Sequence, residues 1–289
     1  MSKVYSFINV RETLMRGVFI LCAAFSIFAL GCICVFLFAE GAPFIGRVGF
    51  ANFFGTTWYL DSEAYGILSM IVASLYVTAL STLFSITIGL FTAICLYRFC
   101  AKSAVTPIRQ MINLLAGIPS VLYGLFGMTV IVPFLRDHVS KDGIGYGILA
   151  ASLVLAVMVL PTITSVSLDA LLAVPKSYYE GALALGATRE QSVFCIVLPA
   201  AKSGILAAFV LSVGRAIGET MAVIMVIGGS PVMPKKLFQS VRTMTANIAM
   251  GATELSGDAA TALVATGVVL FVFTLLLNSS IALLKQSMD

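Results

Sequence analysis

The sequence has 289 residues, of which 60% are hydrophobic and 10% charged, and its mean hydropathy is +1.06. Because a soluble domain carries about 25% charged residues, this composition excludes an ordinary soluble fold and predicts a membrane protein. The formal net charge of +4 is the balance of 17 Lys and Arg against 13 Asp and Glu, and the basic residues are scattered, with no cluster of the kind that binds nucleic acid.

Six apolar runs are each long enough to cross a hydrocarbon core of about 30 Å as a helix. They cover residues 17–39, 67–97, 112–134, 145–168, 203–227 and 261–284 of one transmembrane domain, residues 1–289. The first run follows Arg11 and Arg16, as a signal peptide would. It is longer than the usual apolar stretch of about 7 to 15 residues, so we expect a retained helix and an all-α fold.

The distribution of positive charge indicates the orientation of these spans. With the N-terminus in the cytoplasm, the cytoplasmic segments hold Lys3, Arg11, Arg16, Arg98, Lys102, Arg109, Lys176, Arg189, Lys202 and Lys285. The outer segments then hold fewer, namely Arg47, Arg136, Lys141, Lys235, Lys236 and Arg242. Since cytoplasmic loops carry the excess of Lys and Arg, both termini are expected in the cytoplasm.

Two outer segments have patterns of their own. Between the first two spans, bulky aromatic residues predict a segment along the membrane surface: Phe44, Phe50, Phe53, Phe54, Trp58 and Tyr59. After the fifth span, apolar residues at helical spacing predict a short amphipathic outer helix: Leu237, Val241, Met244 and Ile248.

Gly and Pro interrupt several spans, notably at Gly117, Pro119, Gly124, Pro161, Gly214 and Gly218. Such breaks are tolerated in lipid where neighbouring helices or a cavity satisfy the freed backbone groups. Helices arranged around a pathway would do so, and kinking for packing is the alternative.

The six cysteines are expected to be small buried apolar residues: Cys22, Cys32, Cys34, Cys95, Cys100 and Cys195. None belongs to a Cys-x-x-Cys pair, and His138 is the only histidine, so we predict no metal site and no disulfide framework. No His, Cys or carboxylate cluster has catalytic spacing, and we assign no catalytic residue.

The longest cytoplasmic connection, residues 177–199, has two helix-start signals. In each, Ser or Thr is followed three positions later by Glu or Gln, which is a capping box: Ser177 with Glu180, and Thr188 with Gln191. Gly186 is placed to end a helix in the left-handed conformation, which predicts a helix over 178–185. Two short helices therefore present small side chains that another protein can approach closely.

The same loop resembles the cytoplasmic signature of bacterial ABC importer permeases, which reads Glu-Ala-Ala, three residues, Gly, nine residues, Ile, any residue, Leu-Pro. The matching residues are Glu180, Gly181, Ala182, Gly186, Ile196, Leu198 and Pro199, and Gly181 replaces an alanine. The resemblance implies a type I ABC importer permease fold in which this loop couples to a dimeric ATPase. The chain has no Gly-x-x-x-x-Gly-Lys-Ser/Thr loop, so ATP and magnesium are expected on that partner and no cofactor in this chain.

Arg215 and Glu219 lie near the middle of the fifth apolar span. An arginine facing lipid there costs about 2.5 to 3.5 kcal/mol, and at a spacing of four residues the two side chains can pair. Gly214 and Gly218 beside them predict a close-packing surface. A guanidinium suits an oxyanion, so Arg215 and Glu219 are the candidate substrate pathway, and a structural ion pair is the alternative.

Residues 210–223, which contain Arg215 and Glu219, resemble the C-type (PstC-like) permeases of phosphate ABC importers, as do residues 116–127 and 53–58. The resemblance implies an A-type permease partner, a dimeric ATPase, an extracytoplasmic phosphate-binding protein and a place in the bacterial inner membrane. Alternatives are a permease for sulfate, molybdate or phosphonate, a secondary transporter or channel that works alone, and, most remote, a membrane enzyme.

Overall fold

The computed structural model describes residues 2–59, 64–140 and 142–286, and most of them are helical. The long helices are α1 (Ser2–Val48), α3 (Leu68–Ile94), α7 (Ile148–Ala173), α11 (Lys202–Gly218) and α14 (Asp258–Gln286). Two short strands, β1 (Trp58–Tyr59) and β2 (Ala64–Tyr65), pair in an antiparallel arrangement.

The shorter helices are α2 (Phe50–Phe53), α4 (Lys102–Ala116), α5 (Ser120–Phe126), α6 (Val132–His138), α8 (Lys176–Ala184), α9 (Arg189–Gln191), α10 (Leu198–Ala200), α12 (Met221–Ile224) and α13 (Met244–Gly251). Three π-helical segments extend or join them: η1 (Cys95–Phe99) after α3, η2 (Gly127–Ile131) between α5 and α6, and η3 (Ser192–Val197) between α9 and α10.

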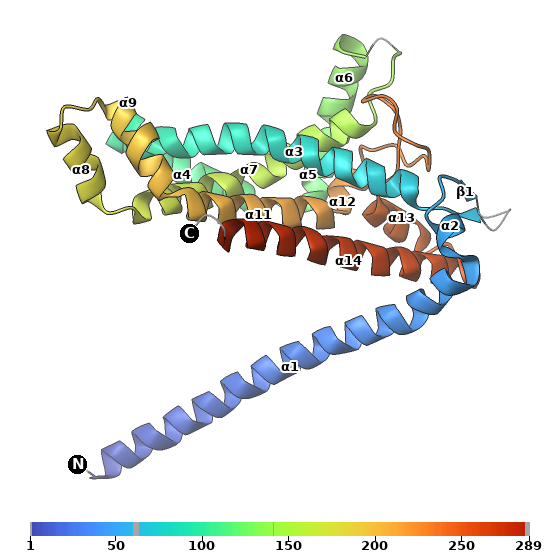
Figure 1. Ribbon diagram of the computed structural model, residues 1–289, viewed down its shortest axis with the longest axis horizontal. Coiled ribbons are helices and arrows are strands. Elements are labelled where there is room, and N and C mark those ends of the chain that lie inside the picture. Colours follow the sequence, from blue (N-terminus) through green and yellow to red (C-terminus); the bar gives the residue numbers. More distant parts are fainter. Residues whose placement is uncertain (1, 60–63, 141, 287–289) are drawn as a thin grey trace.

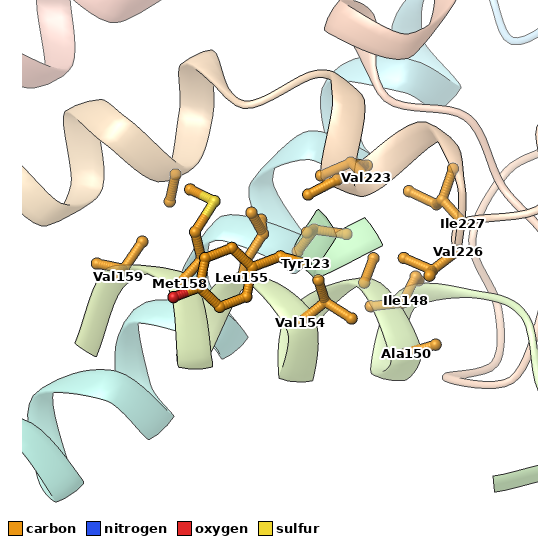
Figure 2. Packing of buried hydrophobic residues seen from close by; sticks show 14 of the residues in the cluster. Tyr123, Ile148, Ala150, Val154, Leu155, Met158, Val159, Val223, Val226 and Ile227 are labelled. Atoms are coloured by element: carbon orange, nitrogen blue, oxygen red, sulfur yellow. The ribbon is translucent and has the colours of Figure 1, made fainter. Parts of the chain in front are cut away.

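Helix α7 lies at the centre of the bundle, because it packs against α3, α4, α5, α11 and α12 and is buried along most of its length. Its apolar residues form the largest hydrophobic cluster together with residues of α3, α5 and the α12 region. Figure 2 shows Tyr123 and the segment around Val223 and Val226 facing Val154 and Leu155 of α7.

Helix α1 packs on α14 only toward its C-terminal end and stands away from the bundle elsewhere (Figure 1). Close packing there depends on Gly41, where a Cβ atom would lie 2.6 Å from Val268 Cγ2. The N-terminal end of α1 and the C-terminal end of α14 both lie toward the end of the molecule that carries α8.

Among the described residues, five helices are long and apolar enough to span a membrane: Leu14–Val48, Leu68–Phe99, Ser120–His138, Ile148–Ala173 and Asp258–Ser280. The pair Arg189–Ala200 and Lys202–Gly218, whose axes differ by 68°, makes a sixth span if it is counted as one. The range expected for the third span, 112–134, crosses a break, because α4 ends at Ala116 and α5 begins at Ser120.

The two outer segments are packed more deeply than the sequence predicts. Of the expected surface aromatics, Phe44, Phe53 and Trp58 are buried with Tyr65 in one cluster of edge-on ring contacts, and the others are exposed. The predicted outer amphipathic helix starts only at Met244, and α13 is largely buried rather than lying on the surface. Its first amide donates to Ser74 Oγ of α3 at 3.0 Å, which ties α13 into the bundle.

Candidate functional site

The fifth span is broken beside its charged residues. Helix α11 ends at Gly218 because Glu219 has an extended backbone, with φ −72° and ψ 131°. The Ala222 amide donates to Glu219 Oε1 at 3.2 Å, and Thr245 Oγ1 donates to the Glu219 carbonyl oxygen at 3.0 Å. The helix expected over 203–227 is thus interrupted, and both α12 and α13 hold the break in place.

Arg215 lies one turn before this break, and its side chain is exposed in this chain. Its NH1 group donates a hydrogen bond to Thr162 Oγ1 of α7 at 3.4 Å. Arg215 and Glu219 are both described by the structure and form no ion pair, so the pairing predicted from their spacing is wrong. That prediction required one continuous helix, whereas the helix ends between the two residues.

The close packing of small residues lies elsewhere than predicted. A Cβ atom on Gly218 would meet nothing within 4 Å, and one on Gly214 would approach only Asn278 Oδ1, at 3.8 Å. A Cβ atom on Gly124 of α5 would instead lie 2.7 Å from Met225 Sδ and close to the backbone of Ala222. One close contact therefore joins α5 to α12, and the part of α11 at Gly214 and Gly218 is open within this chain.

Arg242 fastens the loop that precedes α13. Its Nε donates to the Gly229 carbonyl oxygen at 2.7 Å, and its NH1 group donates to Asn247 Oδ1 at 3.1 Å. Burial lowers the pKa of Arg242 and nearby Glu254 opposes that shift, but an arginine stays charged at neutral pH. These contacts tie the loop at Gly229 to the start of α13, beside the break.

At the opposite end of the bundle, the loop predicted to dock begins with α8, Lys176–Ala184. The predicted capping box of Ser177 with Glu180 is wrong, because the helix starts earlier, with Pro175 at the N-cap and no side-chain cap. Gly186 ends the helix with a φ of +88°, as predicted, and the Ala187 amide donates to the Ala182 carbonyl oxygen.

The second predicted capping box is present. The Gln191 amide donates to Thr188 Oγ1 at 3.2 Å, and the Thr188 amide donates to Gln191 Oε1 at 2.9 Å. It starts α9, which continues through η3 and α10 to the 68° bend before α11. The chain is therefore helical from α9 to α11, the helix that carries Arg215, apart from this bend.

Helix α8 is attached to the bundle through one side chain. Tyr179 is its only buried residue, and it packs in a cluster formed by α3, η1, α7 and η3. Arg98 of η1 lies over the Tyr179 ring at 4.3 Å from the ring centroid and beside Tyr97 at 5.2 Å. Sequence reasoning treated Arg98 only as a loop charge, because nothing in the local sequence shows that a π-helix turns it toward α8.

The signature residues of this loop face outward. Most of them are exposed and two are half-buried: Glu180, Gly181, Gly186, Ile196 and Pro199 are exposed, and Ala182 and Leu198 are half-buried. Leu185 stands at the tip with 92% of its surface exposed, and sequence reasoning did not single it out. An apolar tip on a thinly attached helix is a surface suited to a protein partner.

The cysteines are not buried, contrary to the prediction, because they lie on outward faces of their helices. Four are exposed and two are half-buried: Cys22, Cys32, Cys95 and Cys195, then Cys34 and Cys100. In the parts of the chain that the structure describes, no three His, Cys, Asp or Glu side chains gather into a metal site.

Residues 85–289 match the family described as the inner membrane component of binding-protein-dependent transport systems. The chain is 42% identical over 219 residues to a probable ABC transporter permease, YqgH of Bacillus subtilis, which covers 75% of this chain and 71% of that protein. It is 34% identical over 267 residues to the phosphate transport system permease PstC of Mesorhizobium japonicum, with coverage of 86% and 82%.

Solved structures show the same fold. A permease chain of a bacterial alginate ABC transporter aligns with a TM-score of 0.66 at 19% identity, covering 94% of this chain and 93% of that one. An inward-facing structure of the MetNI methionine ABC transporter aligns with a TM-score of 0.62 at 22% identity, covering 77% and 96%. At these identities the likeness concerns the fold alone.

Proposed function

The chain belongs to the family of inner membrane components of binding-protein-dependent transport systems, and from that premise we propose that it is a permease subunit of an ATP-driven importer of inorganic phosphate. It has the all-α fold of type I ABC importer permeases and is a multi-pass inner membrane protein. The phosphate assignment is supported by identities of 31% to 34% with PstC permeases over most of the chain.

The observation that carries the substrate class is the exposed Arg215 near the C-terminal end of α11, a helix whose only other charged residue is Lys202 at its start. Exposing a permanent cation to lipid deep in a membrane costs free energy. Arg215 therefore faces water, a partner protein or a passing anion rather than lipid. A guanidinium offers several N–H donors in a planar arrangement that matches an oxyanion. Among the described residues Arg215 makes one hydrogen bond, to Thr162, which leaves most of its donors for substrate.

Glu219 contributes in two ways in this proposal. Its carboxylate caps α12 at the break, which fixes the wall beside Arg215. It also accepts a hydrogen bond from a protonated phosphate oxygen, which distinguishes phosphate from sulfate because sulfate has no proton to donate at neutral pH. A fixed carboxylate and a nearby but unpaired arginine suit a singly protonated anion better than a fully deprotonated one.

The energy for transport comes from a separate dimeric ATPase in this proposal. The exposed surface of α8 and the Leu185 tip dock on that partner, which binds ATP and magnesium. The chain itself is a transporter subunit rather than a catalyst. Closure of the ATPase dimer moves α8 and α9, and the continuous connection through η3 and α10 passes the movement to α11.

The remaining partners follow from the same arrangement. A second, A-type permease covers the open face of α11 and completes the translocation path. An extracytoplasmic phosphate-binding protein delivers the anion at the α12–α13 end. In this proposal α8 docks on a cytoplasmic ATPase and so lies in the cytoplasm, and the N-terminal end of α1 and the C-terminal end of α14 lie toward the same end of the molecule (Figure 1).

Uptake of labelled phosphate into proteoliposomes that contain the assembled permease pair, ATPase and binding protein tests the proposal. We expect uptake to require ATP and to be blocked by unlabelled phosphate but not by sulfate, molybdate or phosphonate. Preferential competition by one of those anions would assign the permease to a different oxyanion. Uptake by this chain alone, without ATP, would assign it to the secondary transporters or channels.

A further inference from the structure

Three polar residues of α7 lie on one face, because they stand at positions i, i+3 and i+7: Thr162, Ser165 and Asp169. Each contacts a polar side chain of a neighbouring helix. The pairs are Arg215 with Thr162 at 3.4 Å, Ser165 with Asn113 at 3.4 Å, and Arg109 with Asp169 at 2.6 Å. We call Thr162, Ser165, Asn113, Asp169 and Arg109 the α4–α7 polar row.

The polar row runs from the site of Arg215 to the end of the bundle that carries α8. Asp169 lies seven positions after Thr162 in the helix, a rise of about 10 Å. Helix α7 ends at Ala173, and α8 begins three residues later, at Lys176. In the proposed orientation, the row therefore covers the cytoplasmic half of the path that an anion takes after it leaves Arg215.

Helix α4 has two different exposed sides, one that carries the residues of the polar row and one that is apolar. Met111 and Leu114 are 65% and 73% exposed and apolar, as a lipid-facing surface requires. Each step along a helix turns the side chain by about 100°, so Asn113 and Arg109 lie on another flank, toward α7. Asn113 is exposed, and the side chains of Arg109 and Asp169 are 40% and 60% exposed.

An exposed amide and an exposed ion pair are costly against hydrocarbon. The polar row therefore borders water or a polar partner. Its first residues carry hydroxyl and amide groups, which can donate hydrogen bonds to an oxyanion without binding it through a full charge. The cation of the polar row is Arg109, whose NH2 group lies 2.6 Å from Asp169 Oδ1. The carboxylate therefore neutralises much of the charge of this arginine.

We propose that the α4–α7 polar row is the inner half of the anion path and that Arg109 is the second cationic contact that the oxyanion meets after Arg215. The inference rests on the proposed function and adds residues to the same path. Conduction requires sites that bind strongly enough for entry and weakly enough for release. Because the Asp169 carboxylate partly neutralises the charge of Arg109, this arginine binds the anion weakly enough to release it at the cytoplasmic end.

A pair of substitutions at Asn113 tests the role of charge in the row. Asn113→Asp keeps the size of the side chain and adds a negative charge, whereas Asn113→Ser is the neutral control. In proteoliposomes of the complete complex, phosphate uptake by Asn113→Asp should fall at least about tenfold below that of Asn113→Ser, because a like charge within several ångströms repels the anion. Equal uptake by the two variants, with equal ATPase co-purification, would overturn the proposal.

The exposed ion pair gives a second test that does not depend on Asn113→Asp folding. Arg109→Gln removes the cation and leaves Asp169 unpaired in the path, whereas Asp169→Asn keeps the cation. Uptake should therefore fall several times further with Arg109→Gln than with Asp169→Asn. If the ion pair were purely structural, Arg109→Gln and Asp169→Asn would reduce phosphate uptake equally. Equal reductions would therefore contradict the proposal.

The Arg215→Gln complex, assayed in parallel, separates the two levels of inference. Loss of uptake in Arg215→Gln together with equal uptake in the two Asn113 variants would reject the polar row and leave the proposed function standing. Wild-type uptake in Arg215→Gln would reject the role of Arg215 in the proposed function itself.

Discussion

The two ends of the molecule are built in opposite ways. At one end, Tyr179 is the single buried residue of α8, and the rest of that helix is exposed except for half-buried Ala182. At the other end, α12 and α13 are packed into the bundle, and hydrogen bonds from Thr245 and the Ala222 amide fix the break at Glu219. A thinly attached helix can be moved by a partner, whereas a buried wall keeps the shape of the site beside Arg215 (Figure 1).

Of the substitutions that test this difference between the two ends, Tyr179→Ala is expected to have the largest effect. Tyr179→Ala removes the only buried side chain of α8, and deleting a buried aromatic ring costs about 3–5 kcal/mol. Amide hydrogen exchange of residues 176–184 should become much faster, and the ATPase activity of the assembled complex should no longer respond to the binding protein.

Tyr179→Phe is the matched control, because it keeps the ring and removes only the hydroxyl group. Its hydrogen exchange and its ATPase response should stay close to those of the unchanged protein. If Tyr179→Ala left the exchange of α8 unchanged, attachment through a single side chain would be the wrong description of this end.

The next effect concerns the buried end. In Gly124→Val, the new side chain would meet Met225 Sδ and the Ala222 backbone, and such overpacking typically costs about 1–3 kcal/mol. The thermal unfolding midpoint of the purified permease should fall accordingly. Gly181→Ala, on exposed α8, meets nothing within 4 Å and should raise stability slightly, by about 0.5–1 kcal/mol, because alanine favours the helix. If Gly124→Val and Gly181→Ala had equal thermal unfolding midpoints, the description of one end as tightly packed and the other as exposed would be wrong.

A smaller effect is expected from Arg98→Gln. The guanidinium covers the Tyr179 ring at 4.3 Å, and a cation over an aromatic ring at an exposed site contributes about 0.5–1 kcal/mol. Exchange of α8 amides should accelerate several-fold in Arg98→Gln and much less in Arg98→Lys, which keeps a cation. In a Tyr179→Ala background, Arg98→Gln should have no further effect, and additive losses would show that Arg98 acts elsewhere.

The sequence predicts which segments are apolar enough to span the membrane, because hydropathy depends on composition over some twenty residues. It does not predict where the fifth span breaks. The break at Glu219 is held by Thr245, which is 26 residues away, and no local pattern contains that contact. The predicted pairing of Arg215 with Glu219 was wrong for the same reason.

The two capping boxes show how far local patterns reach. Thr188 with Gln191 forms as predicted, because Thr188 itself has an extended backbone at the start of α9 and no earlier residue starts that helix. Ser177 with Glu180 has the same pattern but lies inside α8, because Pro175 starts the helix earlier. The Arg98 contact with Tyr179 depends on a π-helix that sequence patterns do not reveal.

The measurement that tests the central claim most directly is phosphate uptake by the reconstituted Arg215→Gln complex, compared with the unchanged complex at the same ATPase activity. If the exposed guanidinium meets the oxyanion on its way across the membrane, uptake should fall to background while the ATPase and the second permease still co-purify. Uptake at the unchanged rate would contradict the account, since the permanent charge on α11 would then have no part in transport.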